Sequence, residues 1–453
     1  MNTETERTLA DGGTPETATP GSPVDPTPAY PFAPECPFRL PPELARLRRE
    51  APVARVRLAT GTPAYLVSSY QHVRQVLTDE RFSRRPVRAR AVDGQLGRPP
   101  EGQRGGPPEG RPGGPDAGRP GGPPAGPPRP AAPAFDFGLS VADPADHARW
   151  RRHVNQVFNA RQAEAMRPRV AQLVENLLDE LAGVPQPVDL MEHFAFQLPL
   201  RVLCALFEVP DDLRPAFEEW AASLRASGAS MAAFGAVMSG LHRAAVELVA
   251  ARRARPGDGP LSQLIRQPGA LSDDDLVSTV LLLAIAGYET VATQLGNGLL
   301  ALFQHPAELA RLRSGEQPSD DAVEEILRYA QASTGFAGMV YATCDVTVAD
   351  VVIPAGAAVF VSIDSAGRDE LRLPDPESFD LSRGSVNSHL AFGVGAHFCL
   401  GAPLARVELQ ESLGRLFARF PDLALATPVA DVVMVSNRFN RRPARLDVRL
   451  RAD

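Results

Sequence analysis

The sequence has few cysteines, few tryptophans and little excess of charge. Its 453 residues include 4 Cys and 2 Trp, and the formal net charge is −7. Cys36, Cys204, Cys344 and Cys399 form no CxxC pair, which argues against a disulfide framework and against a structural zinc site. The mild acidity makes nucleic acid an unexpected partner. This cysteine usage fits a reducing cytoplasm best.

The chain also shows no secretory leader and no apolar run of membrane-spanning length. Its first 20 residues carry acids and prolines, where a leader needs a basic start followed by an apolar segment. The longest apolar run, 280–287, is interrupted by Glu289, whereas a membrane span needs roughly 20 predominantly apolar residues. We therefore expect a cytoplasmic protein without a membrane anchor.

Proline and glycine, in contrast, are abundant and concentrated. Residues 94–133 contain 12 Gly and 13 Pro without a strict three-residue period, which predicts a disordered loop insert. Residues 1–30 are rich in Pro, Thr and Glu and predict a disordered N-terminal tail. The remainder, 31–453, is expected to form a single domain that the insert interrupts.

Hydrophobic periodicity indicates a mainly α protein with a small β-sheet region. Apolar residues recur at helical spacing through the middle of the chain. The expected helices cover 163–181, 198–207, 213–227, 232–253, 273–303, 322–329 and 402–420. Between 337 and 363, short Val-rich runs broken by Asp, Pro and Gly predict a small sheet beside the helical body.

The segment FGVGAHFCLG, residues 392–401, is the first candidate for chemistry. It places Cys399 just before a predicted helix, whose backbone N–H groups would stabilise a thiolate. Gly393 and Gly395 permit tight backbone beside a flat partner, and Phe392 offers a ring against it. Taken alone, a buried structural thiol is the commoner explanation. Zinc is disfavoured because His397 and Cys399 are only two residues apart and no second close pair of ligands completes a tetrahedral site.

The same segment matches the F-G-x-G-x-H-x-C-x-G pattern of the cytochrome P-450 superfamily at every fixed position. The chain thus resembles that family, in its soluble, actinomycete-like bacterial form. The resemblance implies a triangular, helix-rich fold that holds haem b between a long central helix and the cysteine loop. It also implies that Cys399 is the axial thiolate ligand of the haem iron.

A second segment, AGYET at 286–290, lies in the long apolar helix that Ser272 is expected to cap. Judged by residue type alone, Thr290 could bond back within the helix and Glu289 could face solvent. The resemblance implies instead that Gly287 makes room for oxygen beside the iron. Thr290 and Glu289 would then be catalytic, because O–O cleavage needs a supply of protons.

Two further segments concern haem retention. Glu325 and Arg328 form an E-x-x-R pair that could be an ordinary surface ion pair; the resemblance makes it a buried structural lock on the haem side. Ser378 stands where many relatives have the third partner of this lock, so Arg383 is the candidate substitute.

The segment DPADHARWRRHVNQVF, 143–158, places His147 and Arg151 four residues apart on one helical face. By resemblance both contact the haem propionates, together with His397. Val340 occupies a position where relatives commonly carry a propionate-binding Arg. Either the other three residues take over its contacts, another donor fills the gap, or haem is held less tightly.

The resemblance implies a monooxygenase that uses O2 to hydroxylate or epoxidise a small-to-mid-sized natural product, free or tethered to a carrier protein. Electrons would come from a ferredoxin and an NAD(P)H-dependent ferredoxin reductase docking near Arg149 and Arg152, and the chain would be a monomer. Two alternatives stay open: oxidative coupling without oxygen insertion, and a haem-binding accessory protein without turnover. The expected substrate contacts are Phe234, Met238, Phe336, Met339, Arg438, Phe439 and Asn440.

Overall fold

The computed structural model describes residues 27–32, 38–58, 61–84, 144–226, 231–269, 271–316, 319–332, 339–383, 389–436 and 440–451. Helices dominate, as the hydrophobic periodicity predicts. The helical elements are α1 (Pro42–Glu50), α2 (Tyr70–Thr78), α4 (Pro144–Val157), α5 (Ala160–Ala182), η3 (Met191–Ala195), α6 (Gln197–Leu206), α7 (Arg214–Ala226), α8 (Met231–Ala254), α9 (Pro260–Arg266), α10 (Asp273–Gln304), α11 (Pro306–Arg313), α12 (Ser319–Tyr329), α13 (Ile363–Ala366), η5 (Leu381–Arg383), η6 (Gly395–His397), α14 (Ala402–Arg419) and η7 (Val429–Asp431).

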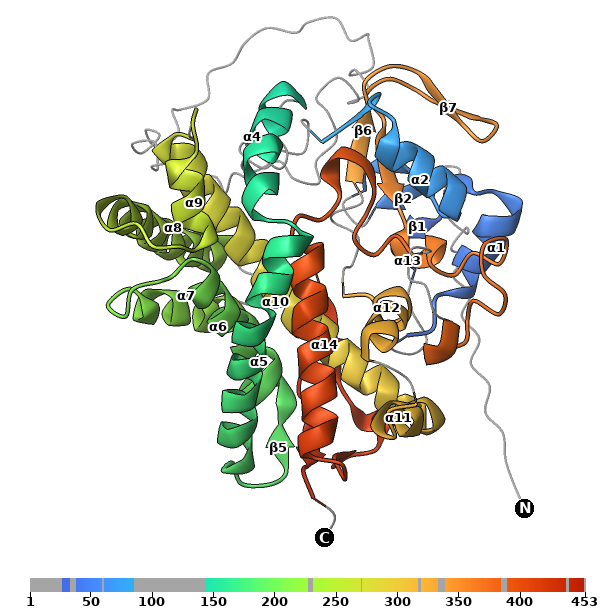
Figure 1. The fold of residues 1–453 in the computed structure, drawn as a ribbon. Helices are drawn as coiled ribbons and strands as arrows, with labels where there is room; N and C mark the ends of the chain where they lie inside the picture. Colours follow the sequence, from blue (N-terminus) through green and yellow to red (C-terminus); the bar gives the residue numbers. More distant parts are fainter. Residues whose placement is uncertain are drawn as a thin grey trace, which may run out of the picture.

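The strands are short and gather into one larger sheet and three small ones. They are β1 (Ala29–Tyr30), β2 (Val53–Leu58), β3 (Pro63–Val67), β4 (Phe82–Ser83), β5 (Val188–Asp189), β6 (Met339–Ala342), β7 (Val346–Val348), β8 (Val351–Ile353), β9 (Ala358–Val361), β10 (Ala424–Leu425), β11 (Met434–Ser436), β12 (Arg441–Pro443) and β13 (Asp447–Arg449). The six-stranded sheet has the order β1-β2-β3-β9-β6-β4. Figure 1 shows it with α1 and α2 on one side of the molecule and the helical body on the other. The fold class expected from the sequence is confirmed.

The sheet joins segments that are remote in the sequence. β3 pairs in parallel with β9, and β4 pairs antiparallel with β6, with Phe82 opposite Ala342 and Ser83 opposite Tyr341. The strands that come before the predicted insert therefore complete the sheet predicted at 337–363. This pairing brings the end of β4 to the edge of the site described below.

One boundary of the expected tail differs from the structure. The sequence predicts disorder through residue 30, yet Ala29 and Tyr30 form β1 and pair in parallel with Arg57 and Leu58 of β2. Tyr30 is buried against Phe32 and Phe360, and this aromatic packing extends the folded part to residue 29. The predicted insert at 94–133 lies outside the described residues.

Helix α10 is the central element of the fold. A capping box begins it: the Ser272 side chain accepts from the Asp275 N–H, and the Asp275 side chain accepts from the Ser272 N–H. The helix packs against α6, α8, α12 and α14, and Figure 1 shows it passing behind α5 and α14. Much of its length is buried, which is why its sequence is apolar on nearly every side.

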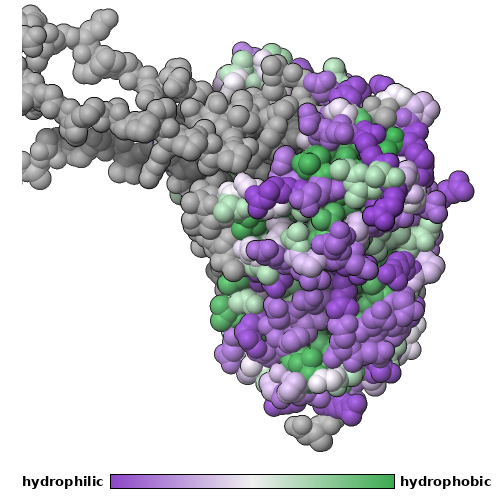
Figure 2. Space-filling view, turned by 90° about the vertical axis from the view of Figure 1, so that its left-hand side faces the viewer, coloured by the Kyte–Doolittle hydropathy of each residue, from purple (hydrophilic) through white to green (hydrophobic). Residues whose placement is uncertain are grey.

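Among the described residues, α10 is the one helix that is long and apolar enough to cross a membrane. Half of its most apolar window is buried inside the protein, which accounts for that composition by core packing. On the face drawn in Figure 2, apolar side chains are scattered among polar ones. Large apolar side chains that are exposed, such as Val352, Leu371 and Val433, lie in separate segments of the chain.

Candidate active site

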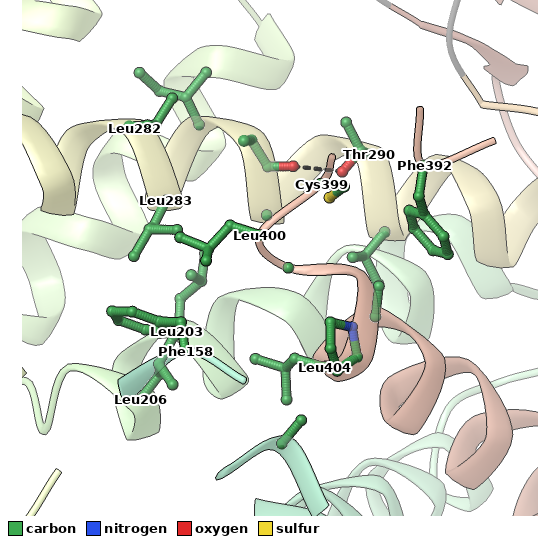
Figure 3. Close-up of a pocket in the computed structure, with 18 of the residues that line it drawn as sticks. Phe158, Leu203, Leu206, Leu282, Leu283, Thr290, Phe392, Cys399, Leu400 and Leu404 are labelled. Atoms are coloured by element: carbon green, nitrogen blue, oxygen red, sulfur yellow. Dashed lines mark hydrogen bonds between the residues drawn. The ribbon is translucent and has the colours of Figure 1, made fainter. Parts of the chain in front are cut away.

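A cavity of about 730 Å³ lies between helix α10 and the loop that precedes α14. Its walls are mostly apolar, and leucines from α6, α10 and α14 form much of them. Figure 3 shows Leu203, Leu206, Leu282, Leu283, Leu400 and Leu404 around this space. Thr290 of α10 and Cys399 of the loop also line the cavity. The two segments singled out in the sequence for chemistry thus meet at one largely apolar site.

The loop holds Cys399 in a fixed backbone frame. Gly393 and Gly395 have φ angles of 69° and 81°, a region that side chains disfavour, and a Cβ on Gly395 would meet the Leu77 carbonyl oxygen at 2.8 Å. The Cys399 N–H donates to the Phe392 carbonyl oxygen at 2.9 Å. The sequence argument for glycine at these two positions is therefore met by the backbone.

The surroundings of the Cys399 thiol suit a metal-bound thiolate. Burial raises the pKa of the Cys399 thiol, while hydrogen bonds from the backbone N–H groups of Gly401 and Ala402 and the charge of Arg151 act in the opposite direction. The residue nevertheless keeps accessible surface, because it opens into the cavity. A metal ion on that side would provide the positive charge that a buried thiolate requires.

Four basic side chains form one rim of the cavity, which we call the basic edge: Arg84, His147, Arg151 and His397. His147 and His397 are stacked, with ring centroids 4.2 Å apart. Arg151 donates from Nη2 to the Phe398 carbonyl oxygen at 2.8 Å and so braces the cysteine loop. The helical spacing of His147 and Arg151 does bring both residues of α4 to the cavity.

The basic edge calls for an anion. Burial, followed by the positive charges of Arg84, His147 and Arg151, lowers the pKa of His397 to about 3. Burial and the charges of Arg151 and Arg84 also lower the pKa of His147, and burial lowers that of Arg84 to about 10. Haem carries two carboxylates, and these would offset the accumulated positive charge. With a cysteine on the cavity floor, the residues present therefore fit haem.

The structure shows what the side chains of Glu289 and Thr290 contact. The Thr290 hydroxyl donates to the Ala286 carbonyl oxygen at 2.5 Å, which is the local back-bond that its position in a helix allows. Glu289 does not face open solvent: its side chain is 12% exposed, and its Oε1 lies 4.0 Å from Nε of Arg442 on β12. Gly287 and both of these residues line the cavity, and α10 continues through them without a break.

The pair Glu325 and Arg328 is buried rather than a surface ion pair. Their side chains are 4% and 2% exposed, and Arg328 donates to both carboxylate oxygens of Glu325 at 2.7 Å. Arg328 also donates to the carbonyl oxygens of Gly367, Pro376 and Ser378. Arg383 lies 3.4 Å from Glu325, so the structure brings all three predicted members of the lock together.

A second buried network next to this lock was not recognised in the sequence. Glu324 accepts from Arg406 Nε at 2.5 Å and Nη2 at 3.0 Å, and its Oε2 lies 2.9 Å from Nε2 of His389. The Arg406 guanidinium also lies 4.6 Å from the ring centroid of Phe392. This network ties α12 to both ends of the cysteine loop. Its sequence signal is weak, because Glu324 is simply one of two adjacent acids.

Glu408 of α14 is another buried acid that the sequence did not mark. Among the described residues its Oε2 has no hydrogen-bond partner, and burial raises the pKa of its carboxyl to about 8. Glu408 is therefore largely protonated in the native state at neutral pH, whereas it ionises at ordinary acidic pH when the chain unfolds.

This difference predicts a specific pH dependence. Between about pH 5 and 8 the native state binds more protons at Glu408 than the unfolded state, so wild-type stability falls as pH rises. Glu408→Gln removes that dependence. Its free energy of unfolding relative to wild type should increase by on the order of 3 kcal/mol from pH 5 to pH 8. Urea unfolding at both pH values measures this shift.

The exposed Glu219→Gln is the matched control, and its free energy of unfolding relative to wild type should be nearly the same at both pH values. An equal response of the two variants to pH would show that Glu408 is ionised in the native protein.

Only some of the expected substrate contacts line the cavity. Met339 and Asn440 line the cavity, whereas Met238 is packed in the main core and does not line it, because α8 turns that side chain toward its neighbouring helices. Phe336, Arg438, Phe439 and the side chain of Phe234 lie outside the described part of the chain. Of the two expected docking residues, Arg149 pairs with Asp275 at 3.2 Å, and Arg152 is exposed.

Comparisons with known proteins point to the same family as the motif around Cys399. Residues 319–426 match the family model described as Cytochrome P-450. The chain is 34% identical over 412 residues to the mycinamicin IV hydroxylase/epoxidase of Micromonospora griseorubida, covering 89% of this chain and 93% of that protein. It is 35% identical over 420 residues to the 6-deoxyerythronolide B hydroxylase of Saccharopolyspora erythraea, covering 89% and 95%.

A solved structure of this family has the same fold. A variant of the mixed-function enzyme MycG in complex with mycinamicin V superposes with a TM-score of 0.78 at 32% sequence identity. The match covers 93% of this chain and 100% of that one.

Proposed function

The chain belongs to the cytochrome P-450 family and is a haem-dependent monooxygenase, and we propose that it oxidises a mid-sized, largely apolar natural product of the macrolactone type in a late biosynthetic step. The observation that carries this proposal is the apolar lining of the cavity that Thr290 and Cys399 share, which would hold the haem and the substrate together. Its leucine-rich walls suit a hydrophobic ring system better than a charged substrate. The names of two relatives, which act on mycinamicin IV and 6-deoxyerythronolide B, support the same substrate class.

In the proposed site, Cys399 would bind the haem iron through its thiolate. His147, Arg151 and His397 of the basic edge would hold the haem carboxylates, and Phe392 would contact the ring system. When bound, thiolate-ligated haem supplies the oxygen-activating redox chemistry, because the thiolate favours O–O cleavage. The residues of this chain then position the substrate, exclude bulk water and move protons.

Thr290 and Glu289 are the proposed proton carriers. Because a hydroxyl has one proton and two lone pairs, Thr290 can accept a hydrogen bond from the cavity while it donates to Ala286. To donate into the cavity, it must rotate away from that carbonyl. Glu289 precedes Thr290 on α10, lines the same cavity and lies near Arg442, so its carboxylate is the candidate to relay protons toward the Thr290 hydroxyl.

We propose that a ferredoxin and an NAD(P)H-dependent ferredoxin reductase deliver the electrons, in the cytoplasm. Arg152 is exposed on α4, the helix that also carries Arg151 beneath the cysteine loop, so it offers a positive charge to an acidic redox protein. Cys204, Cys344 and Cys399 form no disulfide bonds, which suits a reducing compartment.

Turnover with isotopically labelled oxygen tests the proposal. The holoprotein receives NADPH, a ferredoxin, its reductase, ¹⁸O₂ and a panel of macrolactones, aromatic polyketides, terpenes and peptides. We expect at least one macrolactone to displace the water ligand, so that the low-spin spectrum is lost, and to yield a product that gains one labelled oxygen atom. A product that loses two hydrogens would establish the coupling alternative, and ligand binding without substrate-dependent NADPH consumption would establish the accessory alternative.

Two isosteric variants on α10 link this activity to the proposed proton path. Thr290→Val should lower the fraction of NADPH electrons recovered in product several-fold and raise peroxide release accordingly. Thr293→Val is the matched control, because Thr293 is fully buried one turn away and its hydroxyl has no partner among the described residues. Equal coupling in both variants would remove the role assigned to Thr290.

A further inference from the structure

The haem site has a gap in its expected set of cations. By the resemblance, Val340 of β6 occupies the position of an Arg that binds a haem carboxylate. The Val340 side chain is 4% exposed and packs in an apolar cluster with Tyr65, Ala342 and Val359. An apolar side chain cannot donate to a carboxylate, so this position contributes nothing to anion binding.

Strand β4 brings a different cation to the same place. Phe82 is opposite Ala342, and Ser83 is opposite Tyr341, in an antiparallel pair. Continuing that register by one residue places Arg84 opposite Val340. Directly opposed residues in an antiparallel pair project to the same face of the sheet. Phe82 packs on the same apolar cluster as Ala342 and Val340, which agrees with this assignment of faces.

The Arg84 side chain reaches the cavity. It lines the rim together with His147 and Arg151 of α4 and His397 of the cysteine loop. Its charge is close enough to influence both imidazole rings. The basic edge is thus built from two directions, with α4 on one side and the end of β4 on the other.

We propose that Arg84 is a ligand of the haem carboxylates and takes over, from the neighbouring strand, the role that an Arg at position 340 has in related chains. In this chain the cation would come from the residue after β4 instead of from β6, on the same face of the sheet, and would bind the same haem carboxylates. A guanidinium suits this task because its planar donors can hold a carboxylate in two parallel hydrogen bonds. The haem is then held by four basic groups instead of three.

Haem loss from the holoprotein tests this role without measuring catalysis. Haem transfer to excess apomyoglobin is followed for wild type, Arg84→Gln and Arg84→Lys. Losing one charge-assisted hydrogen bond should accelerate haem loss from Arg84→Gln roughly tenfold to a hundredfold. Arg84→Lys retains the charge but not the bidentate contact, so its rate of haem loss should lie between those of wild type and Arg84→Gln.

Arg81→Gln is the matched control. Arg81 lies three residues earlier, pairs with Asp79 on the surface and does not line the cavity, so its variant should release haem at the wild-type rate. Wild-type haem retention by Arg84→Gln, or equally fast loss from the Gln and Lys variants, would overturn the proposal.

Resonance Raman spectroscopy separates a direct contact from a folding defect. The propionate bending band responds to hydrogen bonds at the carboxylates, so it should shift in the haem-loaded Arg84→Gln protein and stay in place in Arg81→Gln. An unchanged band in Arg84→Gln would assign any faster haem loss to the fold and would overturn the carboxylate contact.

Discussion

Replacing Cys399 by Ser is expected to abolish the thiolate-ligated spectrum of the holoprotein completely. Cys399 lines the cavity from a loop whose backbone N–H groups donate hydrogen bonds to its sulfur and which contains two positive-φ glycines. A serine hydroxyl is a harder ligand with a much higher pKa, so it does not supply the thiolate that pushes electron density toward the iron. The measurement is the absorption spectrum of the reduced carbon monoxide complex, together with monooxygenase turnover.

The other described cysteines provide matched controls for this result. Cys344 is exposed, and Cys204 is half-buried on α6; neither lines the cavity. Cys204→Ser and Cys344→Ser should keep the wild-type spectrum. A wild-type spectrum in Cys399→Ser would refute the assignment of Cys399 as the iron ligand. A lost spectrum in either control would assign the ligand to that control's cysteine instead.

Replacing Arg328 by Ala is expected to produce the largest loss of stability, about 3–5 kcal/mol. The substitution removes the bidentate partner of the buried Glu325 carboxylate, which keeps only Arg383 at 3.4 Å as a cation, and it removes the donor from three backbone carbonyl oxygens at once. This is a large part of the net stability of a typical protein, so most of the variant should be recovered without haem. Urea unfolding and the ratio of haem to protein after purification measure both effects.

Arg419→Ala on α14 is the control for this pair. Its partner is Asp179 at 3.0 Å, and both side chains are at least half exposed, so the variant should lose no more than about 1 kcal/mol. Similar losses in the two variants would show that the pair of Glu325 and Arg328 contributes no more than a surface ion pair. Arg328→Lys should be intermediate, because an ammonium cannot reproduce the bidentate contact.

Local patterns allowed most of the helical framework and part of the site to be predicted. The helices follow from hydrophobic periodicity, and the start of α10 follows from Ser272 and the acids after it. In both cases the interacting residues lie within four positions of each other. The same holds for Glu325 with Arg328, for His147 with Arg151 and for the glycines around Cys399. Spacing predicted that these residues act together, and a motif of ten residues predicted the chemistry.

The boundaries were less predictable where tertiary packing decides them. β1 consists of two residues, too few for a periodic signal, and it exists because Tyr30 finds an aromatic pocket beside Phe360. The helical segment after residue 143 divides into α4 and α5 at Asn159, whose side chain caps α5 by accepting from the Gln162 N–H. Met238 was misplaced because periodicity tells which face of α8 is apolar but not which neighbour covers it.

The sequence by itself indicated the family, Cys399 as the candidate iron ligand, the central helix and the pairing of Glu325 with Arg328, because each depends on residues that are close along the chain. Only the tertiary structure decided that Glu289 meets Arg442, that Thr290 bonds back to Ala286, and that Glu324 joins Arg406 and His389. It alone brought Arg84, which follows β4, to the cavity beside His147, Arg151 and His397. Such contacts depend on strand register and helix packing, which sum many weak interactions between distant segments and leave no local pattern to read.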